Sequence, residues 1–143
     1  MNLSRRDLSF LLPVLAAARA AAQEKQEKLP LLPSKTYHND AIPYTGDERK
    51  KTREFFHGTT HVAFALEMHE TVLGPGMITH PPHRHEHEEI IIVFEGTVET
   101  TVDGKTDRAE TGSVIYFGSN TLHNARNAGN TTCRYYVIEL RGV

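Results

Sequence analysis

The stretch GMITHPPHRHEHEEIIIVFEG, residues 76–96, decides both the fold and the chemistry expected of this chain. His83 and His85 lie in sequence typical of β-structure, where side chains two residues apart project from the same face. Glu89 keeps the same parity, and His123 follows later in the chain. Imidazoles and a carboxylate suit Fe, Mn, Ni, Cu or Zn, whereas calcium and magnesium prefer all-oxygen sites. We therefore predict one divalent transition metal bound by His83, His85, Glu89 and His123.

A further histidine, His87, shares the parity of His83 and His85. It could replace one of them as a ligand, orient the site or handle protons beside it, or lie at the rim. Four other histidines lack the spacing, and we predict that they are surface or hydrogen-bonded side chains: His57, His61, His69 and His80.

From Glu54 onward, short β-prone runs alternate with turn signals and no segment shows a helical period, which predicts an all-β sandwich or barrel. Asp103-Gly104 is the clearest hairpin signal, because both residues tolerate the positive φ of a tight turn. The predicted strands are Glu54–His57, Val62–Leu73, Met77–Thr79, Glu89–Glu95, Thr97–Val102, Lys105–Ala109, Ser113–Phe117, His123–Asn127 and Arg134–Leu140.

Two spaced motifs resemble those of a small single-domain cupin, a double-stranded β-helix or jelly-roll barrel. The first runs from Gly76 through the metal-ligand residues to Gly96, with one residue more than the family spacing after Gly76. The second runs from Gly112 to Asn127, with Gly118 and Asn120 in place of the usual Pro and Gly. The resemblance implies that His83, His85, Glu89 and His123 bind a metal inside the barrel.

The run Ile90–Phe94 is apolar on both parities, so both of its faces should be covered. A homodimer and a sandwich strand buried within a monomer both satisfy this pattern. The only cysteine, Cys133, lies in an apolar run, which predicts a buried structural thiol.

The N-terminus is typical of an export signal. A basic start is followed by an apolar run and small residues over residues 1–22, and Arg5-Arg6 resembles a twin-arginine motif, with general secretion as the alternative. The apolar run is too short for a permanent membrane span. We predict a periplasmic or secreted protein with an extended arm over residues 23–53 and a barrel over residues 54–143. Residues 29–33, with two prolines, should run extended along a sheet edge or form a loose tether.

Composition narrows the function classes. The chain has 143 residues, 38% hydrophobic and 24% charged, which is ordinary for one globular domain. A net charge of −2 without a basic patch argues against a nucleic-acid partner. Gly74-Pro75-Gly76 lacks the further glycine and the helix of a dinucleotide site, so nucleotide cofactors are not expected.

The metal ligand set favours a metal-dependent oxidoreductase, dioxygenase-like, acting on a small organic molecule. Because one fold hosts many functions, two alternatives stay open. The first is a non-catalytic module that binds a metal or small ligand in the cell envelope. The second is a metal-dependent isomerase.

Overall fold

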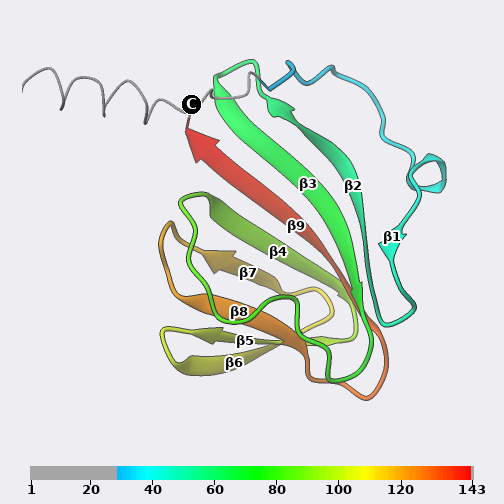
Figure 1. Ribbon diagram of the computed structural model, residues 1–143, viewed down its shortest axis with the longest axis vertical. Helices are drawn as coiled ribbons and strands as arrows, with labels where there is room; N and C mark the ends of the chain where they lie inside the picture. The colour runs from blue at the N-terminus through cyan, green and yellow to red at the C-terminus, as the bar shows by residue number, and fades with distance from the viewer. Residues whose placement is uncertain (1–28, 143) are drawn as a thin grey trace, which may run out of the picture.

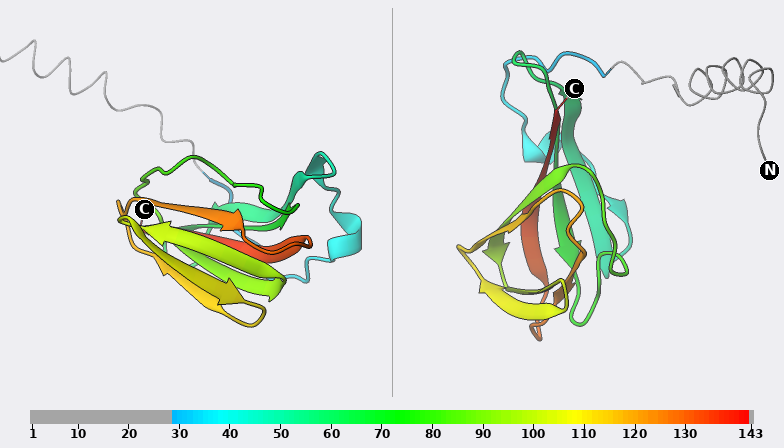
Figure 2. Two further views of the ribbon diagram at one scale, coloured as in Figure 1. Left: turned by 90° about the horizontal axis from the view of Figure 1, so that it is seen from below. Right: turned by 90° about the vertical axis from the view of Figure 1, so that its left-hand side faces the viewer.

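The computed structural model describes residues 29–142, which form two antiparallel sheets. The larger sheet has the order β1-β2-β3-β9-β4-β7 and the smaller one β6-β5-β8, and they face each other as two layers (Figures 1 and 2). The strands are β1 (Thr45–Gly46), β2 (Lys50–Thr59), β3 (Phe64–Leu73), β4 (Glu88–Glu95), β5 (Thr97–Val102), β6 (Lys105–Glu110), β7 (Val114–Phe117), β8 (His123–Asn127) and β9 (Cys133–Gly142). The all-β prediction is confirmed.

Helical structure is confined, within residues 29–142, to the short 3₁₀ turn η1 (Asn39–Ala41). In that same range there is no helix with the length and apolar character needed to cross a membrane. The export signal predicted over residues 1–22 lies outside the described residues.

Most predicted strands have bounds within two residues of the observed ones, and β5 and β8 agree at both ends. The strand predicted to start at Glu54 instead begins at Lys50, because Lys50 and Lys51 pair with Leu73 and Val72 of β3. The start of the sheet therefore extends into the segment that we predicted as an arm.

The predicted strand at Met77–Thr79 is wrong. Of these three residues only Ile78 forms a bridge, to Arg126, and the segment belongs to the irregular connection between β3 and β4. Pro75, Pro81 and Pro82 in this connection lack the N–H that a strand ladder needs, which explains why pairing does not continue. The connection is therefore free to curve across the open end of the barrel.

The core fills the space between the two sheets. Its largest apolar members are Leu73, Ile91, Val93, Val98, Phe117, Tyr135 and Val137. Cys133 is buried among them, and burial raises the pKa of its thiol to about 11, so the predicted structural thiol is confirmed. Asp103 and Gly104 have φ values of 45° and 81°, as the predicted hairpin turn requires.

Both faces of Ile90–Phe94 are at least partly covered, as the sequence predicts. Ile91 and Val93 point into the core, whereas Ile90 and Ile92 are half-buried on the outer face of the large sheet. Phe94 stacks on Tyr136 with ring centroids 4.6 Å apart. Part of the outer face of this strand is thus covered by side chains of the same chain.

The described part of the arm, residues 29–44, runs along β2 (Figure 1). Leu31 forms a parallel bridge with Thr59, which confirms the extended course along a sheet edge. The arm passes so close to β2 that a Cβ atom on Gly58 would lie 2.6 Å from the carbonyl oxygen of Pro30. Only glycine therefore allows this approach without a shift of the backbone.

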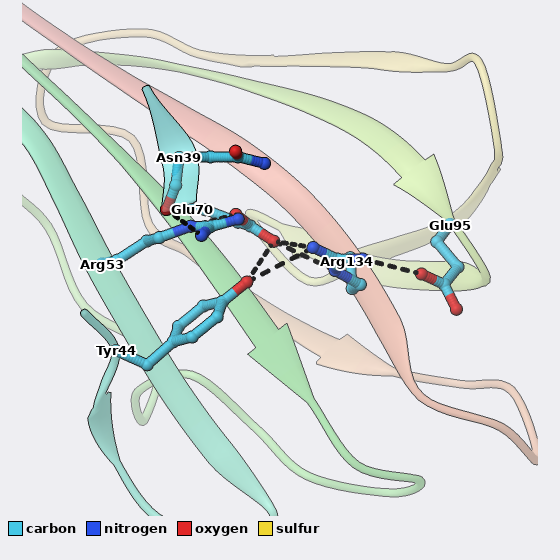
Figure 3. Close-up of polar contacts among 6 residues, drawn as sticks. All are labelled: Asn39, Tyr44, Arg53, Glu70, Glu95 and Arg134. Atoms are coloured by element: carbon cyan, nitrogen blue, oxygen red, sulfur yellow. Dashed lines mark hydrogen bonds and ion pairs between the residues drawn. The ribbon is translucent and has the colours of Figure 1, made fainter. Parts of the chain in front are cut away.

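Glu70, fully buried on β3, fastens the arm to the sheet (Figure 3). Its carboxylate accepts hydrogen bonds from Tyr44 Oη at 2.7 Å, Arg53 Nε at 2.6 Å and Arg134 Nη2 at 2.6 Å. Arg53 also donates to the carbonyl oxygen of Asn39 at 2.6 Å. Burial alone would raise the pKa of Glu70, but these hydrogen bonds outweigh it and lower that pKa.

We predict that Glu70→Ala lowers the free energy of unfolding by about 3 kcal/mol, because Arg53 is left buried without its counter-charge. Urea denaturation at neutral pH measures this. In the wild type, the contribution of Glu70 to the free energy of unfolding is fully present above the ordinary carboxyl pKa of 4.5. This contribution is lost as the pH falls through the lowered pKa that Glu70 has in the folded protein. Glu95→Ala is the control, since exposed Glu95 only pairs with Arg134 at 3.5 Å and should cost less than about 1 kcal/mol. Equal losses in the two variants would contradict the prediction.

Candidate metal centre

His83, in the connection between β3 and β4, pairs directly with His123 at the start of β8. The backbone N–H of His83 donates to the carbonyl oxygen of His123 at 3.0 Å, and the reverse bond has the same length. His123 begins β8, whereas His83 has this single bridge and His85 lies in irregular chain. The β-structure expected around His83 and His85 is therefore limited to this one bridge, although both imidazoles still turn to the same place.

The three imidazoles are close enough to share one ion. Ring centroids are 5.3 Å apart for His83 and His85, 4.8 Å for His83 and His123, and 4.7 Å for His85 and His123. One nitrogen of each lies within 4.8 Å of the other two. Glu89, from β4, places Oε2 3.3 Å from His85 Nε2 and 3.8 Å from His123 Nε2. The three imidazoles thus converge with Glu89 beside two of them, and donor atoms of His85, His87 and Glu89 also lie within 4.8 Å of one another.

Backbone carbonyl groups determine which ring nitrogen of each imidazole carries the proton. His83 Nδ1 lies 3.1 Å from the oxygen of Pro81, His85 Nδ1 lies 2.8 Å from that of His87, and His123 Nδ1 lies 2.8 Å from that of Thr121. Because a carbonyl oxygen only accepts, each Nδ1 carries the proton and each Nε2 keeps a free lone pair. His85 Nε2 and His123 Nε2 are buried without a hydrogen-bond partner among the described residues. This is the arrangement of metal-binding histidines.

The neutral form is favoured at His123, because burial lowers its pKa. A neutral imidazole is the form that binds a metal. The residues present therefore fit a divalent transition metal, with His83, His85 and His123 as nitrogen donors and Glu89 as the oxygen donor.

His87 does not simply lie at the rim of the site, because it contacts both His85 and Glu139. Its ring stacks on His85 with centroids 3.6 Å apart and an interplanar angle of 8°. Nε2 lies 3.2 Å from Glu139 Oε2. Burial, helped by His85, lowers the pKa of His87 to about 4. His87 thus connects the three imidazoles to a second set of polar groups on β3 and β9.

A cavity of about 590 Å³ opens beside the four predicted ligands. Ile91, Phe117 and Val137 give it an apolar wall, and Lys50, Thr52 and Thr71 add polar groups. Tyr135 also lines it, and Tyr135 Oη is buried without a hydrogen-bond partner in the described chain. The cavity can hold a small molecule that is largely apolar and carries a few oxygen atoms.

The other histidines divide into two groups. His57 and His61 are exposed, as predicted. His69 and His80 line the cavity, so their description as ordinary surface histidines is incomplete. His69 Nδ1 lies 3.0 Å from Glu67 Oε1. Sequence reasoning missed this pair, although Glu67 and His69 have the same two-residue spacing as His83 and His85.

Comparison with known proteins supports the cupin resemblance. Residues 69–139 match the family model described as "Cupin domain". No curated protein matches the chain significantly.

Among solved structures, KdgF from Halomonas sp. is similar with a TM-score of 0.64 and 18% identity, covering 76% of this chain and 96% of that one. The polyketide cyclase RemF from Streptomyces resistomycificus has a TM-score of 0.62 and 22% identity, covering 78% and 86%. An RmlC-like cupin from Shewanella frigidimarina is similar with a TM-score of 0.62 and 16% identity. The match covers 76% of this chain and 91% of that one. At these identities the likeness shows the fold alone, and that fold is the jelly-roll cupin barrel.

We predict that His123→Ala weakens binding of a divalent transition metal by more than about 100-fold. Loss of groups that merely orient a ligand already costs about 10- to 100-fold, and His123 is placed to bind directly. Titration of metal-free protein with Zn²⁺ by calorimetry measures the change. His61→Ala, at an exposed histidine outside the cavity, is the matched control. Unchanged affinity in folded His123→Ala would remove this residue from the site.

Proposed function

We propose that this chain, whose residues 69–139 carry a cupin domain, is a metal-dependent oxidoreductase of dioxygenase-like chemistry acting on a small organic molecule. One observation carries the proposal. Three imidazoles, oriented through Nδ1, direct Nε2 atoms and the Glu89 carboxylate toward one point beside a cavity of about 590 Å³. Four protein ligands leave open positions on a five- or six-coordinate ion.

A redox-active metal bound there supplies oxygen activation and polarises a substrate oxygen. The chain's own residues hold and orient the reactants. Ile91, Phe117 and Val137 exclude water from the apolar part of the substrate. Tyr135 Oη, buried and without a partner among residues 29–142, is available to donate a hydrogen bond to a substrate oxygen. Burial raises its pKa well above the usual value, so it stays protonated as a donor.

A second candidate is a metal-dependent isomerase or cyclase that uses no oxygen. The similar structure of RemF, named as a polyketide cyclase, favours keeping this candidate. The same four ligands can hold a metal without redox activity, such as Zn²⁺, and the same cavity can hold the substrate. A binding module without turnover is the remaining outcome.

Two further features belong to the proposal. Residues 1–22 direct export, by the twin-arginine route, to the periplasm or the exterior, and the mature N-terminus of protein recovered from the periplasm tests this. The chain also forms a homodimer through the outer face of β4 and β7. Val114 and Tyr116 are 65% and 58% exposed there, beside half-buried Ile90 and Ile92, and light scattering tests the pairing.

We predict that the protein, loaded with Fe²⁺ and given candidate small oxygenated substrates, consumes oxygen in proportion to the product formed. His83→Ala should lower the rate by more than about 100-fold through loss of the metal. Tyr135→Phe should retain the metal and lower kcat/KM by about 10-fold, because only one hydrogen bond to the substrate is lost. An oxygen electrode coupled to mass spectrometry of the product measures both.

Outcomes of this experiment separate the three functions. If product forms without oxygen consumption, and also forms when the protein is loaded with Zn²⁺, the isomerase or cyclase function is favoured over the oxidoreductase. Ligand binding with full recovery of the unchanged ligand would leave a binding module. Metal binding is measured independently in each variant, so a loss of activity is traced to the metal or to the substrate contact.

A further inference from the structure

Three carboxylates form a row across the large sheet, next to the candidate metal centre. Glu139 on β9 is the register partner of Glu67 on β3 and also of Glu89 on β4. These three strands lie side by side (Figure 1). Register partners project from the same face, so all three side chains share the inner face on which Glu89 meets the imidazoles.

Such a row is unfavourable unless something compensates its charge. Like charges directly opposite each other destabilise a sheet, and burial strengthens their repulsion. Side-chain exposures are only 24% for Glu67, 25% for Glu139 and 12% for Glu89. A protonated carboxyl, a charged histidine or a bound cation would each relieve this repulsion, and burial beside Glu67 and Glu89 already raises the pKa of Glu139.

Arginine supplies positive charge to other buried carboxylates but not to this row. Glu70 pairs with Arg53 and Arg134, and Glu99 pairs with Arg108 and Arg126. Within residues 29–142, no lysine or arginine nitrogen lies within 4.0 Å of the row, whose ion-pair partners are all histidines. Histidine is the residue that offers a lone pair to a metal.

Part of the row has metal-site geometry of its own. Glu67, His69 and Glu139 each place one donor atom within 4.8 Å of the other two. None of these three belongs to the set of His83, His85, Glu89 and His123. His69 and Glu139 line the 590 Å³ cavity, and Glu67 and Glu139 also line a smaller pocket of about 180 Å³. An ion could thus reach this cluster without passing through the first centre.

We propose that Glu67, His69 and Glu139 form a second divalent metal site. Two carboxylates and one imidazole suit Mn²⁺, Fe²⁺ or Zn²⁺. His87, whose Nε2 lies 3.2 Å from Glu139 Oε2, is placed to complete the set from the side of the first centre. A cation bound there supplies positive charge to two of the three carboxylates. The site is built from residues separate from those of the proposed oxidoreductase centre, so either can stand without the other.

Zinc stoichiometry of the full chain tests the proposal. Metal-free protein is saturated with Zn²⁺, freed of excess metal, and analysed by elemental and native mass spectrometry. We expect two ions per chain in the wild type and one in the double variant Glu67→Gln, Glu139→Gln. The double variant His83→Ala, His123→Ala should keep one ion, held by the second site. Glu54→Gln is the matched control, because exposed Glu54 lies opposite His69 on β2 but outside the cluster, and it should keep two.

A Glu67→Gln, Glu139→Gln variant that binds as many ions as the wild type would overturn the second site. If the proposed first centre is wrong, the His83→Ala, His123→Ala variant keeps the wild-type count while the glutamine variant still loses one. The two proposals therefore fail in different ways.

Thermal unfolding gives a second readout that a merely structural role would not reproduce. With a chelator present, the glutamine variant should melt at or above the wild-type temperature, because the repulsion within the row is relieved. With excess Zn²⁺, the wild type should gain more than the variant, because it binds one ion more. A variant that melts lower than the wild type in chelator, and gains equally from Zn²⁺, would show that the carboxylates are structural and would overturn the proposal.

Discussion

The reciprocal backbone hydrogen bonds between His83 and His123 are the constraint on which the candidate metal centre depends. They close the irregular connection between β3 and β4 onto the start of β8, so two residues far apart in sequence are held at a fixed separation. The carbonyl groups of Pro81, His87 and Thr121 then set the three imidazole rings. Backbone atoms thus orient each ring through Nδ1, and ring stacking of His87 on His85 and of Phe117 on His123 adds to this.

The sequence predicted the barrel from short-range patterns, and it predicted the four candidate ligands from the spacing of two motifs. Strand alternation and the turn at Asp103-Gly104 are short-range signals, and the bounds of β5 and β8 follow from them. The β-structure expected around His83 and His85 is limited to one bridge, because prolines interrupt pairing there. The ligands still converge, since the ends of the connection are fixed by strands that the pattern does identify.

What the sequence could not provide is which strands become neighbours. Glu67 and Glu139 belong to no motif in the sequence, and only the order β3-β9-β4 places them in a row with Glu89. The same holds for Glu70, since Tyr44, Arg53 and Arg134 come from three separate segments of the chain. Long-range register arises from the whole fold, so charge clusters of this kind appear only once the topology is known.

The arm along β2 also pairs with backbone groups near one edge of the large sheet. A bare edge strand offers unpaired N–H and C=O groups that template pairing with another chain. At one end of β2 these groups bond to residues 30–32, and at the other end to β1. Gly58 permits the close approach, and the Glu70 hydrogen bonds hold Tyr44 of the arm in place. The N-terminal segment therefore leaves fewer backbone groups of β2 free to pair with a strand of another molecule.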